Sequence, residues 1–98
     1  MNHRTFNNWP DGWMAAAGQG AQLEAELARE TPEGHVLFDR RVTLLATGRA
    51  DDVLLGLDDG QVARVHLSWV VETDPIWPAT TLFPSIALWA EAEARGEL

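Results

Sequence analysis

DDVLLGLDDGQVARVH, residues 51–66, contains two apolar runs on either side of Asp58-Asp59-Gly60 and predicts a β-hairpin. A two-residue turn at Asp59-Gly60 would place Arg64 among apolar side chains. Desolvating an unpaired arginine costs several kcal/mol, on the order of a small domain's whole stability. A three-residue loop with Gly60 in the left-handed conformation instead pairs Asp52 with His66 and keeps the charged residues together. We therefore expect the three-residue loop.

In this register the two strands divide their side chains between two faces of a sheet. One face carries Val53, Leu55, Leu57, Ala63, Val65, Leu67 and Trp69. The other face carries Asp52, Leu54, Val62, Arg64, His66 and Ser68. We expect the apolar face to cover the core, and the mixed face to be open or to meet a partner.

The flanking residues extend the hairpin into a predicted antiparallel meander of three strands. Alternating apolar residues predict a first strand over Val36–Thr47, and the hairpin supplies Asp52–Leu57 and Gln61–Val70. Two prolines lie within Glu72–Thr81, so we expect this segment to be a loop.

A helix is predicted on each side of the meander. The stretch Trp13–Glu30 is rich in alanine, leucine and glutamate, and Pro32 ends it. Pro84 suits the first turn of a second helix that runs to about Arg95. The predicted fold is α+β: helix, three-stranded antiparallel meander, helix, with both helices on one face of the sheet.

Length and charge restrict the class of protein. The 98 residues suffice for one hydrophobic core, so we expect a single domain over 1–98 with fraying at 1–10. Fifteen acidic and seven basic residues give a net charge of −8, which disfavours nucleic acid and anionic membranes as partners. The apolar run Trp13–Ala17 is far shorter than the roughly 20 residues that cross a bilayer. We expect a cytoplasmic protein.

The mixed face of the sheet is the first candidate site. It gathers Asp52, Arg64, His66 and Ser68, and the first strand adds Asp39, Arg41 and Thr43. His66 could titrate near neutral pH. Three interpretations stay open: a cross-strand pair that only stabilises the hairpin, a contact for a ligand or partner, and a catalytic group.

The chain lacks the usual signatures of metal, thiol and cofactor chemistry. It has no cysteine, and His3, His35 and His66 show none of the short spacings typical of a zinc site. No glycine-rich phosphate loop follows a predicted strand. We expect neither a metal nor a cofactor.

Tryptophans and acidic residues mark further candidate contacts. Trp69 and Trp89 fall on inward faces and are expected in the core, whereas Trp9 and Trp77 precede prolines in loops. An exposed Trp77 would be a strong contact residue. Three acidic clusters are solvated faces or attract a basic partner: Glu24 with Glu26 and Glu30, Asp58 with Asp59, and Glu91 with Glu93.

Three short motifs resemble a pattern in small uncharacterised bacterial proteins. They are Asp51-Asp52-Val53-Leu54-Leu55, Val65-His66-Leu67-Ser68-Trp69 and Trp77-Pro78, which are similar to DDVLF, VHLTW and WP. Ser68 departs from the threonine of the pattern. The resemblance implies one compact domain and no activity.

Our leading hypothesis is a non-catalytic interaction module, of the immunity or inhibitor type, that binds a macromolecule through an open sheet face. The contact residues would be Asp52, Arg64, His66, Ser68, Arg41 and Trp77. The alternative is a small-ligand-binding protein or minor enzyme using Arg64, His66 and Asp52. A homodimer through the sheet face or an edge strand is a third hypothesis.

Overall fold

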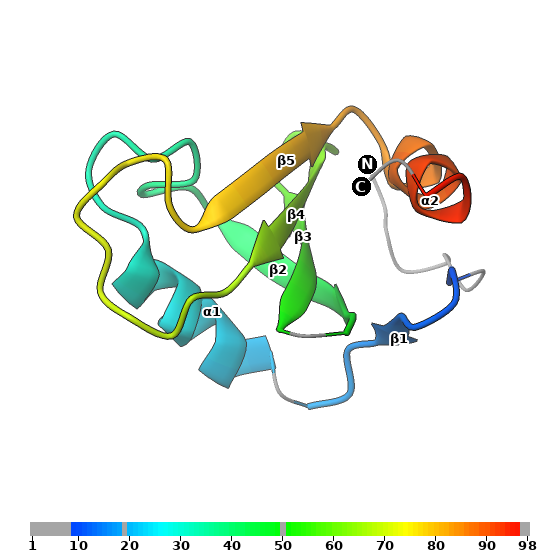
Figure 1. Cartoon of the computed structure of the whole chain (residues 1–98), viewed down its shortest axis with the longest axis horizontal. Helices are drawn as coiled ribbons and strands as arrows, with labels where there is room; N and C mark the ends of the chain where they lie inside the picture. The colour runs from blue at the N-terminus through cyan, green and yellow to red at the C-terminus, as the bar shows by residue number, and fades with distance from the viewer. Residues whose placement is uncertain (1–8, 19, 50, 97–98) are drawn as a thin grey trace.

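The computed structural model describes residues 9–18, 20–49 and 51–96 and contains one five-stranded antiparallel sheet and two helices (Figure 1). The elements are β1 (Met14–Ala15), α1 (Gly20–Glu30), β2 (Val42–Thr47), β3 (Asp52–Leu57), β4 (Val62–His66), β5 (Ala79–Phe83) and α2 (Ile86–Ala94). The strands follow one another across the sheet in chain order. The α+β class is confirmed, but the sheet has five strands where the sequence predicted three.

The hairpin register is confirmed. Asp52 lies opposite His66, and Val53 lies opposite Val65. The Leu57 N–H donates to the Gln61 carbonyl at 2.9 Å, and Gly60 has a φ of +91°. A positive φ is accessible to glycine at little cost, which is why the three-residue loop closes here.

Three predicted boundaries were wrong. The first strand begins at Val42 and not at Val36, because residues 32–40 form successive turns, with the Phe38 N–H donating to the His35 carbonyl. The third strand ends at His66 and not at Val70. The predicted first helix begins at Gly20, since Met14 and Ala15 pair with β2 instead.

The segment predicted as a loop over 72–81 is partly a strand. Ala79–Phe83 forms β5 and pairs with β4, so that Phe83 lies opposite Val62 and Ala79 opposite His66. Pro78 and Pro84 flank this strand without interrupting it. Prolines at these positions are compatible with an edge strand.

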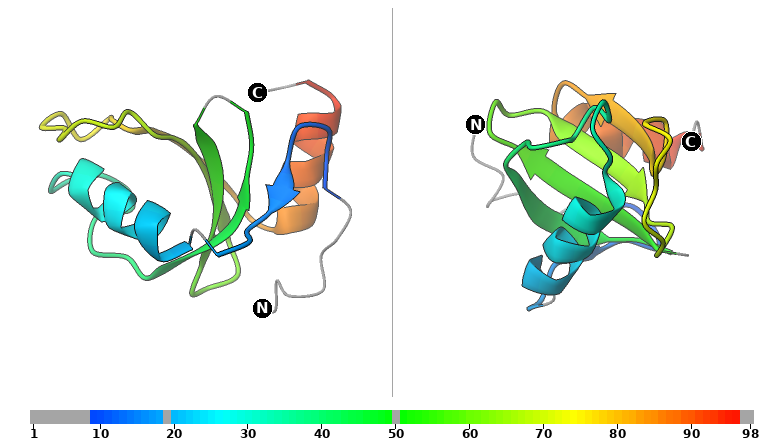
Figure 2. Two further views of the ribbon diagram at one scale, coloured as in Figure 1. Left: turned by 90° about the horizontal axis from the view of Figure 1, so that it is seen from below. Right: turned by 90° about the vertical axis from the view of Figure 1, so that its left-hand side faces the viewer.

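The two helices cover opposite faces of the sheet (Figure 2). Leu27 of α1 packs into one apolar cluster with Val53 and Leu55. Trp89 of α2 packs into a second cluster with Leu54 and Val62 on the other face. The prediction that both helices share one face was therefore wrong, and the reason is that β3 and β4 carry apolar residues on both faces. The mixed face is not open.

The helix α2 is capped at its first end by a serine and followed at its other end by the predicted glycine. Ser85 is its N-cap and its side chain accepts a hydrogen bond from the Leu88 N–H at 3.2 Å. Gly96 follows the helix with a φ of +70°. The prediction that Pro84 lies in the first turn was wrong, because Pro84 precedes the Ser85 cap and the helix begins at Ile86.

Within the described part of the chain, no helix has the length and apolar character needed to cross a membrane. The fraying predicted for residues 1–10 falls largely on 1–8, which lie outside the described residues.

The second cluster gives a direct test of the two-sided sheet. Trp89 is fully buried, whereas its neighbour Leu88 is 46% exposed. Replacing Trp89 with alanine is expected to lower the free energy of unfolding by about 3–5 kcal/mol, because it empties the space between α2 and the sheet. Leu88→Ala is the matched control and should change it by less than about 1 kcal/mol. Urea denaturation measures both, and equal effects would contradict the packing described.

Candidate functional site

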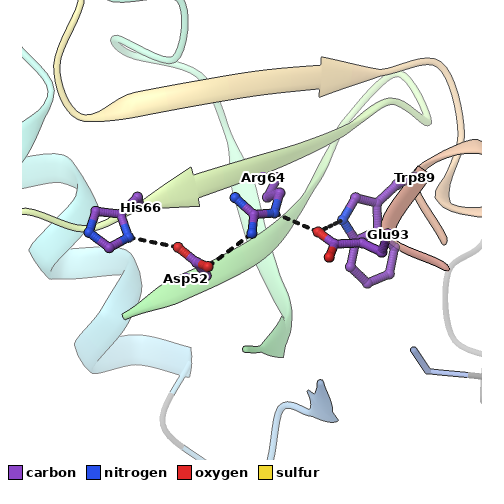
Figure 3. Close-up of polar contacts among 5 residues, drawn as sticks. All are labelled: Asp52, Arg64, His66, Trp89 and Glu93. Carbon is purple, nitrogen blue, oxygen red and sulfur yellow. Dashed lines mark hydrogen bonds and ion pairs between the residues drawn. The ribbon is translucent and has the colours of Figure 1, made fainter. Parts of the chain in front are cut away.

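Asp52 links the two predicted site residues of β4 (Figure 3). One carboxylate oxygen lies 2.7 Å from His66 Nδ1, and the other accepts a hydrogen bond from Arg64 Nη2 at 2.9 Å. The cross-strand pairing of Asp52 with His66 brings these groups together. The structure therefore assembles the Asp52, Arg64 and His66 cluster that the register predicted.

Arg64 continues this network to α2. Its Nε donates to Glu93 Oε2, and the same oxygen accepts a hydrogen bond from Trp89 Nε1 at 3.1 Å (Figure 3). The guanidinium carbon also lies 5.7 Å from the centre of the Trp13 ring, a cation–π distance. Arg64 thus binds two carboxylates and contacts a tryptophan ring, and through Glu93 it links the sheet to α2.

Glu93 is a residue that sequence reasoning assigned to a solvated acidic group. Its side chain is only 12% exposed. A signal was present, since Glu93 lies four residues after Trp89, the inward residue of the predicted helix, and i,i+4 residues share a helix face. An inward glutamate on α2 would then be expected to meet the arginine of β4.

The other predicted contact residues lie apart from this cluster. Ser68 follows the end of β4 and binds Glu30 of α1. Arg41 and Asp39 line a depression between α1 and residues 37–42, together with Phe38. Thr43 lies in β2 opposite Gly56. Trp77 lies in the loop before β5 and is 47% exposed.

Arg64 is expected to stabilise the fold through its two carboxylate partners. Arg64→Met would remove the guanidinium from two partly buried carboxylates, those of Asp52 and Glu93, which should lower the free energy of unfolding by about 1–3 kcal/mol, between the values for exposed and buried pairs. His66→Gln is the control, because the His66 side chain is 53% exposed. It should change stability by less than about 1 kcal/mol. If chemical denaturation finds the two variants alike, the network does not support α2.

A second arrangement involves the buried carboxyl group of Glu30 at the end of α1. Glu30 has no exposed surface. One of its oxygens accepts hydrogen bonds from the Ser68 N–H and hydroxyl at 2.8 and 3.0 Å, and the other accepts from the Trp69 N–H at 2.7 Å. Because the N–H groups of residues 68 and 69 donate to Glu30, they do not take part in a strand ladder. These hydrogen bonds explain why β4 stops at His66.

The chain from residue 67 to 78 forms a loop, and His35 binds the end of this loop at Pro78. Its buried ring accepts a hydrogen bond at Nδ1 from the Leu37 N–H, so the proton resides on Nε2, which donates to the Pro78 carbonyl at 2.9 Å. Thr80 adds a hydroxyl bond to the same carbonyl at 2.9 Å. The 67–78 loop is therefore anchored near its beginning by Glu30 and at its end by His35.

The 31–41 and 67–78 loops lie side by side beyond the end of α1 (Figures 1 and 2). Seven of the ten exposed large apolar side chains among the described residues lie on these two loops. We call them the two-loop surface: Val36, Phe38, Trp69, Val70, Val71, Ile76 and Trp77. The expectation that Trp69 lies in the core was wrong, because its backbone turns toward Glu30 with a φ of +61° and leaves the ring 47% exposed.

Glu26 and Glu30 form an acid pair one turn apart on α1. Burial raises the pKa of the Glu30 carboxyl, and its hydrogen bond with Glu26 raises it further against the opposing N–H donors of 68–69. The same hydrogen bond lowers the pKa of Glu26, with help from Arg29, which binds it at 3.0 and 2.8 Å. The protonated form of Glu30 can donate to the Glu26 carboxylate while still accepting from Ser68 and Trp69.

This pair predicts a pH dependence of stability with a definite sign. Because the pKa of Glu30 is raised in the folded state, its contribution to the free energy of unfolding is present below the ordinary value of 4.5. This contribution is lost as the pH rises through the folded pKa. The lowered pKa of Glu26 acts oppositely, since its contribution is lost as the pH falls through its folded value. From pH 4.5 upward, the free energy of unfolding should therefore fall relative to that of Glu30→Gln, by at most about 1.4 kcal/mol per pH unit. Urea titrations between pH 3 and 8 check this, and parallel curves for the two proteins would refute it.

Neither described depression of the surface adjoins His66. One lies beside Arg41, and the other is lined by Trp9, Pro10, Asp11, Ala87, Ala90, Glu91, Glu93 and Ala94. Among the residues that the structure describes, no three histidine or acidic side chains converge as a metal site would require. His3 lies outside those residues.

Comparisons of the chain with protein-family models, with curated proteins and with solved structures give no match.

Proposed function

We propose that this protein is a non-catalytic interaction module, of the immunity or inhibitor type, which binds a basic protein partner through the two-loop surface. The observation that carries the proposal is the concentration of exposed apolar side chains, Trp77 and Ile76 among them, on two adjacent loops. A monomer rarely exposes such residues together, whereas interaction sites do. Tryptophan in particular dominates the energy of many interfaces.

The anchoring of the loops supports the same proposal. A binding loop that is ordered before it meets its partner loses less conformational entropy on association. Here Glu30 binds the backbone of 68–69, and His35 binds the Pro78 carbonyl. The Trp77 N–H also donates to the Asp74 carbonyl at 3.0 Å, which closes a turn at the tip.

Charge favours a basic partner. Glu33, Asp39 and Asp74 are exposed on the two loops, and Glu72 is partly exposed. These four acidic residues compare with two arginines on the same loops, Arg40, which already lies 3.6 Å from both Asp58 and Asp59, and the exposed Arg41. With a net charge of −8 over the whole chain, the surface would steer a basic protein toward the apolar contacts.

The cluster of Asp52, Arg64 and His66 is a weaker basis for function. Both Asp52 oxygens are engaged, and Arg64 already binds Asp52 and Glu93. A ligand would have to displace these internal partners. For this reason the proposed contact surface is the pair of loops, with Trp77 retained from the predicted residues, and not the sheet face.

The test is a binding comparison between variants of the two-loop surface and a matched variant elsewhere. A protein captured from the source lysate by immobilised wild type would be purified and its Kd measured by calorimetry. Trp77→Ala should weaken binding by about 2 kcal/mol, roughly thirty-fold in Kd, and binding should also weaken with added salt.

Leu88→Ser is the control, because Leu88 is equally exposed but lies on α2. It should leave the Kd within about two-fold of wild type. If Trp77→Ala binds as tightly as wild type, or if Leu88→Ser weakens binding as much as Trp77→Ala does, the two-loop surface is not the contact.

A further inference from the structure

The strand β5 is an edge of the sheet. It pairs with β4 on one side, and within the described residues no segment pairs with its other side. In Figure 1 it forms the upper border of the sheet. The strand has neither a charged residue nor a proline within Ala79–Phe83, so it lacks two devices that commonly protect edges.

The ladder between β3 and β4 shows which way the backbone groups of β4 point. The Leu57 N–H donates to the Gln61 carbonyl, and the Leu67 N–H donates to the Asp51 carbonyl at 3.1 Å. Alternate residues of an antiparallel strand bond to opposite neighbours. The backbone N–H and C=O groups of Ala63 and Val65 therefore point toward β3. Those of Val62, Arg64 and His66 point toward β5.

The same alternation determines which backbone groups of β5 point away from β4, and we call these the outer row of β5. Phe83, Thr81 and Ala79 lie opposite Val62, Arg64 and His66, so their backbone groups bond to β4. Thr80 and Leu82 then direct their N–H and C=O groups outward. Pro78 and Pro84 lie at bends just outside the strand and have no N–H, and the Pro78 carbonyl is already bound by His35 and Thr80. The free row is therefore two residues long and is bounded by prolines.

We propose that this row pairs with the same row of a second copy, giving an antiparallel dimer about a two-fold axis through Thr81. Thr80 of each copy would exchange two hydrogen bonds with Leu82 of the other, four bonds in all. Thr81 would lie beside its own counterpart, and threonine pairs are favourable across strands. The prolines end the pairing at both ends, since neither has an N–H to donate.

The choice of a second copy follows from this self-complementarity. A two-fold axis through Thr81 matches every free donor to a free acceptor, which an arbitrary peptide need not do. The strand is uncharged although the chain carries −8, so it is a place where two copies can approach. The short contact and the repulsion between like charges make the dimer weak. This inference does not depend on the two-loop surface.

Sedimentation equilibrium over rising protein concentration provides the first measurement. The average mass should rise from 10.8 kDa toward twice that value. Added salt should strengthen the dimer, because it screens the repulsion between the two acidic copies. That is opposite to the effect expected for a complex with a basic partner.

Charge variants at the axis provide the decisive control. Thr81→Lys and Thr81→Asp each place like charges side by side and should remain monomeric, whereas an equimolar mixture should recover the dimer. Thr43→Lys makes the same change at an exposed site on β2 and should dimerise as wild type does. Circular dichroism confirms that each variant folds.

Amide hydrogen exchange locates the contact, since the Thr80 and Leu82 amides should exchange more slowly as concentration rises. A wild type that stays at monomer mass up to about 1 mM overturns the proposal. It is also overturned by a dimer that Thr81→Lys leaves intact, or by variants whose mixture does not recover association.

Discussion

The burial of β3 on both of its faces is the constraint on which the rest of the structure depends. Leu54 and Leu55 are neighbours in sequence and point to opposite faces, yet their exposed fractions are 0% and 1%. Each face therefore requires its own cover, and α1 and α2 supply one each. Once both faces of the sheet are covered by helices, neither face is open to another molecule.

Glu30 connects this core to the loops. A carboxyl group without exposed surface must find hydrogen-bond donors, and it finds them on the backbone of Ser68 and Trp69. This contact ends β4 and turns the chain away from the sheet. His35 secures the other end of the same segment at Pro78. The apolar side chains between these two anchors point to solvent because Glu30 and His35, which are buried, bind the backbone of this segment.

The hairpin of β3 and β4 could be predicted because its register depends on local chemistry alone. The cost of burying Arg64 excluded the shorter loop, and Gly60 supplied the required backbone conformation. The same register brought Asp52, Arg64 and His66 together correctly. What it could not supply was the third partner of Arg64, since Glu93 comes from a helix placed by tertiary packing.

The helix positions were mispredicted although the sequence contains a relevant signal. An unbroken apolar run such as Val53-Leu54-Leu55 is typical of a strand buried on both faces, whereas alternation is typical of one open face. The strand β5 was missed because prolines near a segment were taken to exclude pairing along it. Trp69 was misplaced for a different reason: nothing local to residues 66–70 shows that a buried glutamate from α1 binds their backbone.

The central claim is that buried anchors hold the exposed apolar loops in one conformation. Amide hydrogen exchange of the wild-type protein at Ser68 and Trp69 tests this claim most directly. The account predicts protection comparable to that of the amides in β4, although these two residues lie outside any strand. Exchange as fast as that of a free loop would contradict it, because the two-loop surface would then lack the fixed backbone on which the proposed function depends.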